Sequence, residues 1–432
     1  MPVLSHRIAL DPTPTQRIAL ARAAGCSRVA YNWGLAAWRS EYEAHKVDPT
    51  RPSPRFSTLL ARWSREKHAL FPWMKESPKD ANILALWDLD TAFKKFFQKT
   101  ARYPRFKQKG RNAPSFGLSN DKFRIEGRRA RLPVIGWIRA HESLRFEGKI
   151  LSGRITKTAD RWFLSVTVEA AHARPTAPAN TVIGIDLGVN VLATTFDGST
   201  VGEITNPRAL RSAARRLHRA QLAVRRKKRA RDKRLGAPKK GERRPPGQNL
   251  IKAQAKVARI HARVANVRRD AIHKATTRIA RSYATVVIED LAVRNMTRRA
   301  RGRGRAAKAG LNRAILDAGF GEFRRQLTYK IPLHGGDLRA TDRFYPSSKT
   351  CCACGLVKKT LQLSERTFTC DSCGHVVPRD ENASRNLYTL GARGIHACGG
   401  DIRPRDLRDR AAVPVETGIA GRLCEEFKVR SS

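Results

Sequence analysis

The chain has 432 residues, enough for two to four domains by the usual relation between length and domain number. It carries 86 Lys and Arg against 37 Asp and Glu, a formal net charge of +49, so it repels itself unless an anion neutralises it. No apolar run approaches the roughly 18 residues that a membrane span needs, and the start of the chain lacks the pattern of a signal peptide. We therefore expect no membrane partner, a cytoplasmic location (with the nucleoid when bound), and nucleic acid as the partner.

The N-terminal segment predicts one strand followed by helices. Residues 3–10 read as a strand, and DPTPTQ at 11–16 supplies a turn and a helix start, because Pro is favoured near the first helical position. Residues 19–45 are helical in composition. A second helix is expected over 77–99, with one apolar face that we assign to the core: Ile83, Leu86, Leu89, Phe93, Phe96 and Phe97.

A basic loop is expected over 103–116, with Tyr103, Phe106 and Phe116 among its charges. Basic residues interleaved with aromatic ones are what single-stranded nucleic acid can use, but an ordinary solvated loop has the same composition. The candidate nucleic-acid contacts in this loop are Arg105, Lys107, Lys109 and Arg111.

After this loop the pattern changes to period two, which predicts antiparallel strands over 123–135, 143–150 and 153–169. A Pro-rich linker at 173–180 then marks a domain boundary. Residues 181–198 follow as a strand, a Gly turn and a second strand.

A strongly basic helical hairpin is expected over 207–282. Residues 208–244 hold 17 Lys and Arg and two acids, and Leu210, Leu217 and Val224 recur every seven residues. After a Pro/Gly break, apolar residues repeat by three and four: Val257, Ile260, Val264, Val267 and Ala271. Narrow apolar seams of this kind predict two long antiparallel helices. The charged outer faces could be merely solvated, but their one-sided charge favours contact with nucleic acid.

The remaining segments predict a strand, a loop, a helix and a tail. Residues 284–291 form a short apolar run that ends in acids, typical of a buried parallel strand. We expect a flexible basic loop at 296–310 and one amphipathic helix at 311–331. The Gly-, Pro- and Arg-rich tail, 393–432, is expected to be mostly disordered.

Two Cys-x-x-Cys pairs, separated by 15 residues, predict a metal site. Their thiolates can converge tetrahedrally on a structural zinc ion, and a Gly follows each pair where the turn favours it. The predicted zinc ligands are Cys351, Cys354, Cys370 and Cys373. Cys352 lies inside the first pair, and we leave it unligated.

Three acids stand where propensity alone does not explain them. Asp186 interrupts an apolar strand, Glu289 ends one, and Asp380 lies at a helix start. Each has a simpler explanation: Asp380 could cap its helix, and Glu289 or Asp290 could pair with a cation. Together they have the arrangement of an RNase H-like nuclease, whose carboxylates hold two Mg²⁺ ions about 4 Å apart for phosphodiester hydrolysis.

These motifs resemble the TnpB family of transposon-encoded nucleases, which is related to miniature type V CRISPR effectors. The resemblance rests on GIDLG around Asp186, on IEDL around Glu289, on the two Cys pairs and on RDENASRN around Asp380. It extends through PTPTQ, YPRFK and DRFYPSSKTC, and covers roughly residues 5 to 390. One departure is Pro378, where the family often has an additional Asp.

The resemblance implies a mixed α/β multidomain fold: an N-terminal wedge β-barrel with a helical recognition insertion, and a RuvC (RNase H-like) nuclease domain with a helical hairpin and an inserted zinc ribbon. The implied boundaries are 1–10 and 113–172 for the wedge, 11–112 for the insertion, 173–180 for the linker, 181–346 for the nuclease domain, 347–376 for the ribbon and 377–392 for the last nuclease segment.

The implied activity is a metal-dependent RNA-guided DNA endonuclease that cuts at a single site. Asp186, Glu289 and Asp380 would be the catalytic residues and ligands of two Mg²⁺ ions, with Zn²⁺ in the ribbon. The implied partners are a guide RNA and double-stranded target DNA, bound by a protein that is monomeric on its RNA. The alternatives are a DNA transposase acting on transposon ends, a guided repressor without cleavage, and a plain RNA-binding protein.

Overall fold

The computed structural model describes residues 2–170, 176–236, 244, 246–300, 304–362 and 364–393. These residues fall into two compact units, which divide at 173/174. The expected disordered tail beyond residue 393 lies outside the described part. Among the described helices, none has both the length and the apolar character needed to cross a membrane.

The first unit is built on an antiparallel sheet of seven strands in the order β2-β6-β7-β1-β5-β4-β3. Alternate residues of β1 and β7 are buried, as expected for strands with one face on a core. In the described residues β2 and β3 do not pair, and they remain the two edges. The strands are β1 (Val3–Asp11), β2 (Ser115–Ser119), β3 (Arg124–Glu126), β4 (Arg129–Leu132), β5 (Gly136–Ala140), β6 (Gly148–Thr158) and β7 (Arg161–Ala170).

Helices are inserted between β1 and β2, namely α1 (Pro14–Val47), α2 (Phe56–Leu70), η1 (Pro72–Glu76) and α3 (Lys79–Phe97), while a short η2 (Asn120–Lys122) follows β2. The predicted helix start is confirmed: Thr13 caps α1, and Gln16 completes a capping box. On α3 the apolar face is buried at its centre, but Phe97 at the end is 64% exposed. Phe116 is fully buried in β2, so the expected loop over 103–116 was wrong at its end.

The second unit contains a mixed sheet of five strands in the order β10-β9-β8-β11-β12. The predicted parallel strand is confirmed, because β11 runs parallel to β8 on one side and to β12 on the other. The strands β8, β9 and β10 form an antiparallel meander. Their bounds are β8 (Val182–Leu187), β9 (Val191–Phe196), β10 (Val201–Thr205), β11 (Thr285–Ile288) and β12 (Asp337–Ala340).

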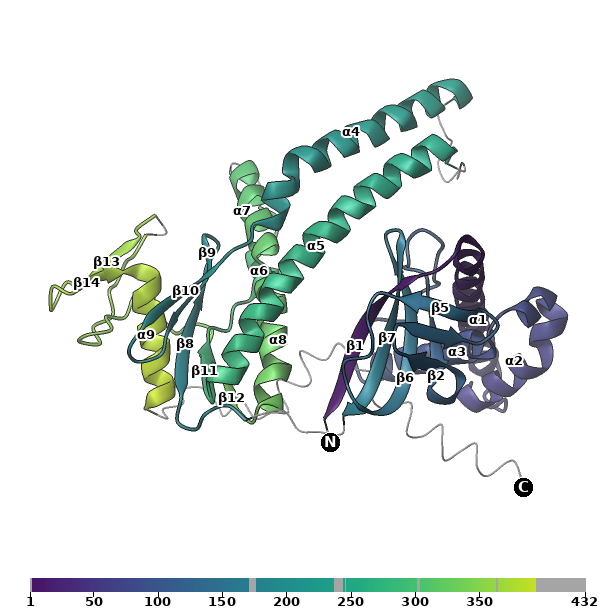
Figure 1. Cartoon of the computed structure of the whole chain (residues 1–432), viewed down its shortest axis with the longest axis horizontal. Helices are drawn as coiled ribbons and strands as arrows, with labels where there is room; N and C mark the ends of the chain where they lie inside the picture. Colours follow the sequence, from purple (N-terminus) through teal and green to yellow (C-terminus); the bar gives the residue numbers. More distant parts are fainter. Residues whose placement is uncertain are drawn as a thin grey trace. The chain divides into compact units, whose positions relative to one another are not determined.

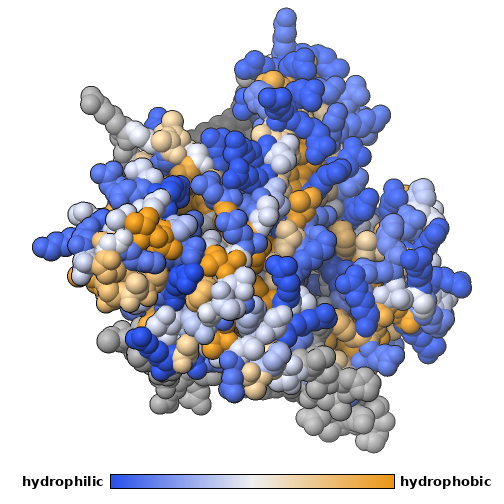
Figure 2. Space-filling model, turned by 60° about the vertical axis from the view of Figure 1, so that its left-hand side comes forward, coloured by the Kyte–Doolittle hydropathy of each residue, from blue (hydrophilic) through white to orange (hydrophobic). Residues whose placement is uncertain are grey.

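The basic hairpin is confirmed as α4 (Ala209–Leu235) and α5 (Gln248–Ser282), which project together from the sheet (Figure 1). Leu217 of α4 and Ile260 and Val264 of α5 form part of its narrow core. At the base, Asp317 accepts hydrogen bonds from the first backbone N–H groups of α4 and pairs with Arg268 of α5 at 2.8 Å. Figure 2 shows that the projecting end is almost entirely hydrophilic.

The expected helix over 311–331 is two helices, α7 (Arg305–Ala318) and α8 (Phe320–Leu333), which follow the short α6 (Val293–Met296). Gly319 separates them with a φ of 79°, a left-handed conformation that suits glycine. The expected basic loop over 296–310 was therefore wrong from residue 305 onward, because helix α7 begins there.

Helices cover both faces of the five-stranded sheet (Figure 1). Apolar residues of α5 and α8 pack with Ile183, Ile185, Val286 and Ile288. On the other face lies α9 (Arg379–Ala392), directly after a small ribbon of β13 (Thr367–Thr369) and β14 (Val376–Pro378). The approach is close, because a Cβ on Gly184 would lie 2.2 Å from the backbone oxygen of Ser384.

Candidate active site and metal centre

Strand pairing brings Asp186 and Glu289 to one point. In the register of β8 and β11, Ile185 pairs with Ile288, so the next residues on the two strands are Asp186 and Glu289. Side chains alternate along a strand, and Ile185 and Ile288 face the core beneath α5 and α8. Both acids therefore point to the opposite face, the face that carries α9.

Helix α9 brings the third acid to the same point. Gly391, near its end, packs on Val182, and Ser384 in its middle packs on Gly184. The helix thus runs antiparallel to β8, and its first turn lies over the carboxyl end of that strand. Asp380 is in that turn, with its Oδ2 4.0 Å from the position of a Cβ on Gly188.

The three carboxylates interact electrostatically. Burial raises the pKa of Asp186 well above the usual range of a carboxyl, and Glu289 and Asp380 raise it further against the charge of Arg379. Burial also raises the pKa of Glu289, although a hydrogen bond from Ser347 and the charge of Arg379 oppose the effect. Such a cluster holds concentrated negative charge at a partly buried point and is stabilised by a cation.

Ion pairing explains Asp290, but neither ion pairing nor helix capping explains Glu289 and Asp380. Asp290 is an ion-pair acid: Arg324 and Arg343 donate to it, and although burial opposes them they hold its pKa below the usual range. Glu289 has no ion pair among the described residues and accepts instead from the Ser347 hydroxyl. Helix α9 has no side-chain cap, so Asp380 is not serving as one.

Carboxylate donors of this kind suit a divalent cation. Carboxylate oxygens are the ligands that Mg²⁺ takes in proteins, and here three chain segments contribute one carboxylate each. Burial raises the pKa of Asp186 and Glu289 and nearby carboxylates raise it further, and a bound cation would offset both effects. A cavity of about 290 Å³ opens beside Glu289, lined by Asp290, Leu291 and residues 341–349, and Phe344 in that segment is 86% exposed.

The structure brings the four predicted cysteines together. Their Sγ atoms lie within 4.8 Å of one another, with 3.7 Å between Cys351 and Cys373 and 3.5 Å between Cys354 and Cys370. Thiolates around a tetrahedral zinc ion at about 2.3 Å are roughly 3.8 Å apart, so the cluster fits that metal. Cys352 lies outside the cluster, with its Sγ 3.6 Å from Nε2 of His375.

Two equivalent turns shape this cluster. The N–H of Gly355 donates to the backbone oxygen of Cys351 at 2.9 Å, and the N–H of Gly374 donates to the backbone oxygen of Cys370 at 3.2 Å. Both glycines have the positive φ that the turn requires, 81° and 69°. Backbone N–H groups of Cys373 and Ser372 lower the pKa of the Cys370 thiol to about 6, whereas, against the backbone N–H of His375, hydrogen bonds with the neighbouring thiols raise the pKa of Cys373 to about 12.

The candidate nucleic-acid contacts of the first unit do not all line one cavity. Arg105 and Arg111 line a cavity of about 380 Å³ with Arg39, Phe106, Gln108 and Asn112. Lys107 instead turns toward the ring of Tyr31, 3.9 Å from its centroid, and toward Asp88. Lys109 is exposed but does not line the cavity.

The sequence did not identify three buried polar residues beside the carboxylates: Ser347, Asn382 and Asn386. The two asparagines lie one turn apart on α9 and donate to backbone oxygens of the segment that precedes the first cysteine pair. Their spacing of four residues in RDENASRN was the available signal, since it places two amides on one helical face.

Family models match three parts of the chain. A model described as "Probable transposase" matches residues 165–300, a Cas12f1-like TNB domain matches 320–387, and a helix-turn-helix domain matches 1–46. Among solved structures, Cas12f1 in its complex with sgRNA and target DNA aligns with a TM-score of 0.51 over 86% of this chain and 83% of that chain. At 14% sequence identity, that likeness concerns the fold alone.

Relatives align with nearly the whole chain. InsQ of Escherichia coli K12, provisionally named an RNA-guided DNA endonuclease, is 33% identical over 91% of this chain and 94% of its own length. A protein of Streptomyces pristinaespiralis with the same provisional description is 35% identical over 91% of this chain and 90% of its own length. The sequence motifs, the three carboxylates and these alignments lead to one conclusion: the chain belongs to the TnpB family of transposon-encoded RNA-guided nucleases.

Proposed function

We propose that this protein is an RNA-guided DNA endonuclease associated with a transposon, with one nuclease site formed by Asp186, Glu289 and Asp380. The observation that carries the proposal is the meeting of these carboxylates at the end of β8 and β11, under the first turn of α9. They come from distant parts of the chain, and burial together with the charges of Glu289 and Asp380 raises the pKa of Asp186, as is common at sites built to hold a cation.

The three acids would hold two Mg²⁺ ions. When bound, these ions supply an attacking water of lowered pKa and stabilise the leaving oxygen at phosphorus. The chain itself orients the carboxylates: strand register fixes Asp186 beside Glu289, and the contact of α9 with Gly184 fixes Asp380. The four clustered cysteines would hold a structural Zn²⁺.

The two units would divide the work of the complex. In the proposed arrangement, the first unit is the wedge domain with its helical recognition insertion, and the second is a RuvC-type domain that carries the zinc ribbon. A guide RNA and double-stranded target DNA would be the partners, since a guide–target duplex is held by its backbone and needs many cationic contacts. Arg105 and Arg111 at the 380 Å³ cavity are candidate contacts in the first unit.

The test begins with protein purified from cells that carry its native flanking DNA. We expect one dominant structured RNA to co-purify, ending in sequence from outside the element. With that RNA and Mg²⁺, the protein should cut matched double-stranded DNA. Asp186→Ala should bind the same DNA but lose more activity than the roughly 100-fold that loss of an outer ligand partner costs.

Other outcomes would identify other functions. Binding without cleavage by the wild-type complex would mean a guided repressor. Joined strands rather than cut ends would mean a transposase. Co-purification of only bulk tRNA and rRNA fragments would leave charge-driven RNA binding as the simplest explanation.

A further inference from the structure

The segment 347–352, which leads into the first cysteine pair, contacts the proposed nuclease site at its other end. Ser347 is only 3% exposed, and its hydroxyl donates to Oε1 of Glu289. Its own N–H donates to the backbone oxygen of Tyr345 at 2.9 Å. The main chain of Ser347 is therefore anchored, and its buried hydroxyl contacts one oxygen of Glu289.

Two side chains of helix α9 form hydrogen bonds with the same segment. Asn386 donates to the backbone oxygens of Ser347 and Thr350 at 2.8 and 2.7 Å. Asn382 donates to Thr350 at 2.7 Å and accepts from the N–H of Cys352 at 3.0 Å. Asn382 is fully buried and Asn386 is 6% exposed, so these hydrogen bonds are shielded from water. Because α9 also carries Asp380, the segment lies between two of the three carboxylates.

The cysteine cluster shares a residue, Cys351, with segment 347–352. Cys351, which is 1% exposed, stands between the two residues that Asn382 holds, Thr350 and Cys352. Among the described residues, the thiols contact one another, and the N–H of Ser372 donates to Sγ of Cys370. A zinc ion there would fix Cys351 and, through the short segment, the position of Ser347.

We propose that segment 347–352 is a positioning element through which the zinc cluster sets the geometry of the Mg²⁺ ligands. Ser347 holds Glu289, while Asn382 and Asn386 tie the same segment to the helix that carries Asp380. This inference rests on the proposed nuclease function and adds a role for the cysteine cluster: it supports the affinity of the carboxylates for metal. The alternative is that the hydroxyl of Ser347 only satisfies a partly buried acid.

The test measures metal affinity in the full chain loaded with its guide RNA, with Mn²⁺ as the probe. Each variant is compared with the same variant carrying Asp186→Ala, so that Mn²⁺ held by RNA cancels. Ser347→Ala should weaken Asp186-dependent Mn²⁺ binding by about 10- to 100-fold, the usual effect of losing an outer partner of a metal ligand. Ser347→Thr retains the hydroxyl and should recover most of the affinity, whereas Ser364→Ala, an exposed serine of the ribbon, should leave it unchanged.

The role of zinc is tested with Cys354→Ser, a substitution of an exposed cysteine of the cluster. We expect it to weaken Mn²⁺ binding as well. In the double variant with Ser347→Ala, Cys354→Ser should reduce Mn²⁺ affinity by less than it does alone, because both substitutions disrupt one chain of contacts. Melting curves and zinc content establish that each variant is folded.

Two results would overturn the inference, and a third would overturn its premise. Wild-type affinity in a folded Ser347→Ala protein would show that the serine positions nothing. Fully additive losses in the double variant would show that zinc acts by another route. If Asp186→Ala itself left Mn²⁺ binding unchanged, the proposed nuclease site, rather than the positioning element, would be wrong.

Discussion

Asp186 and Glu289 differ from Asp290 in their partners. Asp290, directly after Glu289, is neutralised by two arginines, and its pKa is held low. Asp186 and Glu289 instead have carboxylates as neighbours: burial raises the pKa of both, and Asp380 raises both further. Neighbouring residues of similar chemistry therefore have opposite roles, one structural and one suited to binding a cation.

The raised pKa of Asp186 predicts a pH-dependent stability difference. A carboxyl whose pKa is higher in the folded than in the unfolded state stabilises the fold at low pH, and this contribution is lost as the pH rises through the folded pKa. In Mg²⁺-free buffer, Asp186→Asn should melt close to the wild type near pH 4 and at a higher temperature than the wild type near pH 8. Thermal melts at both pH values measure the difference.

Added Mg²⁺ should reverse the order of the two melting temperatures, so that the wild type melts above Asp186→Asn. Added Mg²⁺ should raise the melting temperature of the wild type, because the ion binds the folded carboxylates and not the unfolded chain. It should have little effect on Asp186→Asn. If, in Mg²⁺-free buffer, Asp186→Asn and the wild type differed in melting temperature by the same amount at both pH values, the raised pKa of Asp186 would be contradicted.

At the scale of elements, the contact of α9 with β8 sets the site. Gly184 leaves no room for a side chain, since its Cβ would lie 2.2 Å from Ser384 O and 2.3 Å from Tyr388 N. Both atoms belong to helix backbone, which cannot yield alone. The absence of a side chain at this residue therefore determines how closely Asp380 approaches Asp186.

Gly184→Ala is predicted to damage both stability and cleavage. Forcing a methyl group into a packed interface costs about 1–3 kcal/mol of stability. Here a shift of α9 would relieve the overlap, and that shift would move Asp380. Denaturant unfolding measures the first effect, and cleavage by the guide-loaded protein measures the second.

The matched control is Gly321→Ala on the exposed side of α8, where nothing lies within 4 Å of a Cβ. It should raise stability by up to about 1 kcal/mol, because alanine is the better helix former, and leave cleavage unchanged. Equal effects of the two substitutions would argue against the close contact.

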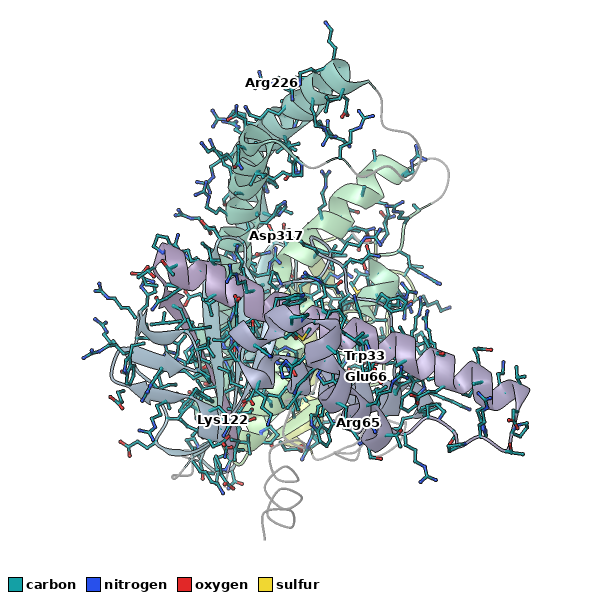
Figure 3. The ribbon with its side chains drawn as sticks, turned by 90° about the vertical axis from the view of Figure 1, so that its right-hand side faces the viewer. Trp33, Arg65, Glu66, Lys122, Arg226 and Asp317 are labelled. Atoms are coloured by element: carbon teal, nitrogen blue, oxygen red, sulfur yellow. The ribbon has the colours of Figure 1, made fainter. Side chains whose placement is uncertain are left out.

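At the scale of the whole molecule, charge is concentrated on the hairpin. Figure 3 shows Arg226 on the outer part of α4, with Asp317 near the base. Most of α4 beyond its seam is exposed, and its basic residues have few acids to pair with in the sequence. Such a surface gains binding free energy by releasing counterions from nucleic acid.

Affinity for the guide RNA should therefore fall steeply with salt. Four exposed arginines of α4, Arg215, Arg219, Arg226 and Arg229, lie outside the seam. Changing all four to Gln should reduce the slope of log affinity against log salt by roughly 3, at about 0.7–0.9 for each phosphate that the protein no longer neutralises. Changing them to Lys keeps the charge and should keep the slope. An unchanged slope in the Gln variant would mean that these residues do not touch the RNA.

Much of the local structure could be predicted from the sequence, because its causes are local. Two apolar runs around a Gly turn marked the strands within 181–198, and seven-residue spacing marked the hairpin. The cysteine spacing determined which four thiols converge. Prediction was wrong over 305–310, where mostly exposed Arg, Ala and Lys are good helix formers and begin α7, and at Phe116, where burial in β2 overrode a composition that favours loops.

The sequence by itself determined the charge, the cysteine cluster and the identity of the three acids, since each follows from residue type and spacing along the chain. Only the tertiary structure decided which acids meet. Parallel pairing of two distant strands placed Glu289 beside Asp186, and packing against Gly184 placed Asp380 above them. It also decided that Lys107 turns inward and that Ser347 links the ribbon to Glu289. Contacts between segments far apart in sequence depend on register and packing, which local patterns do not contain.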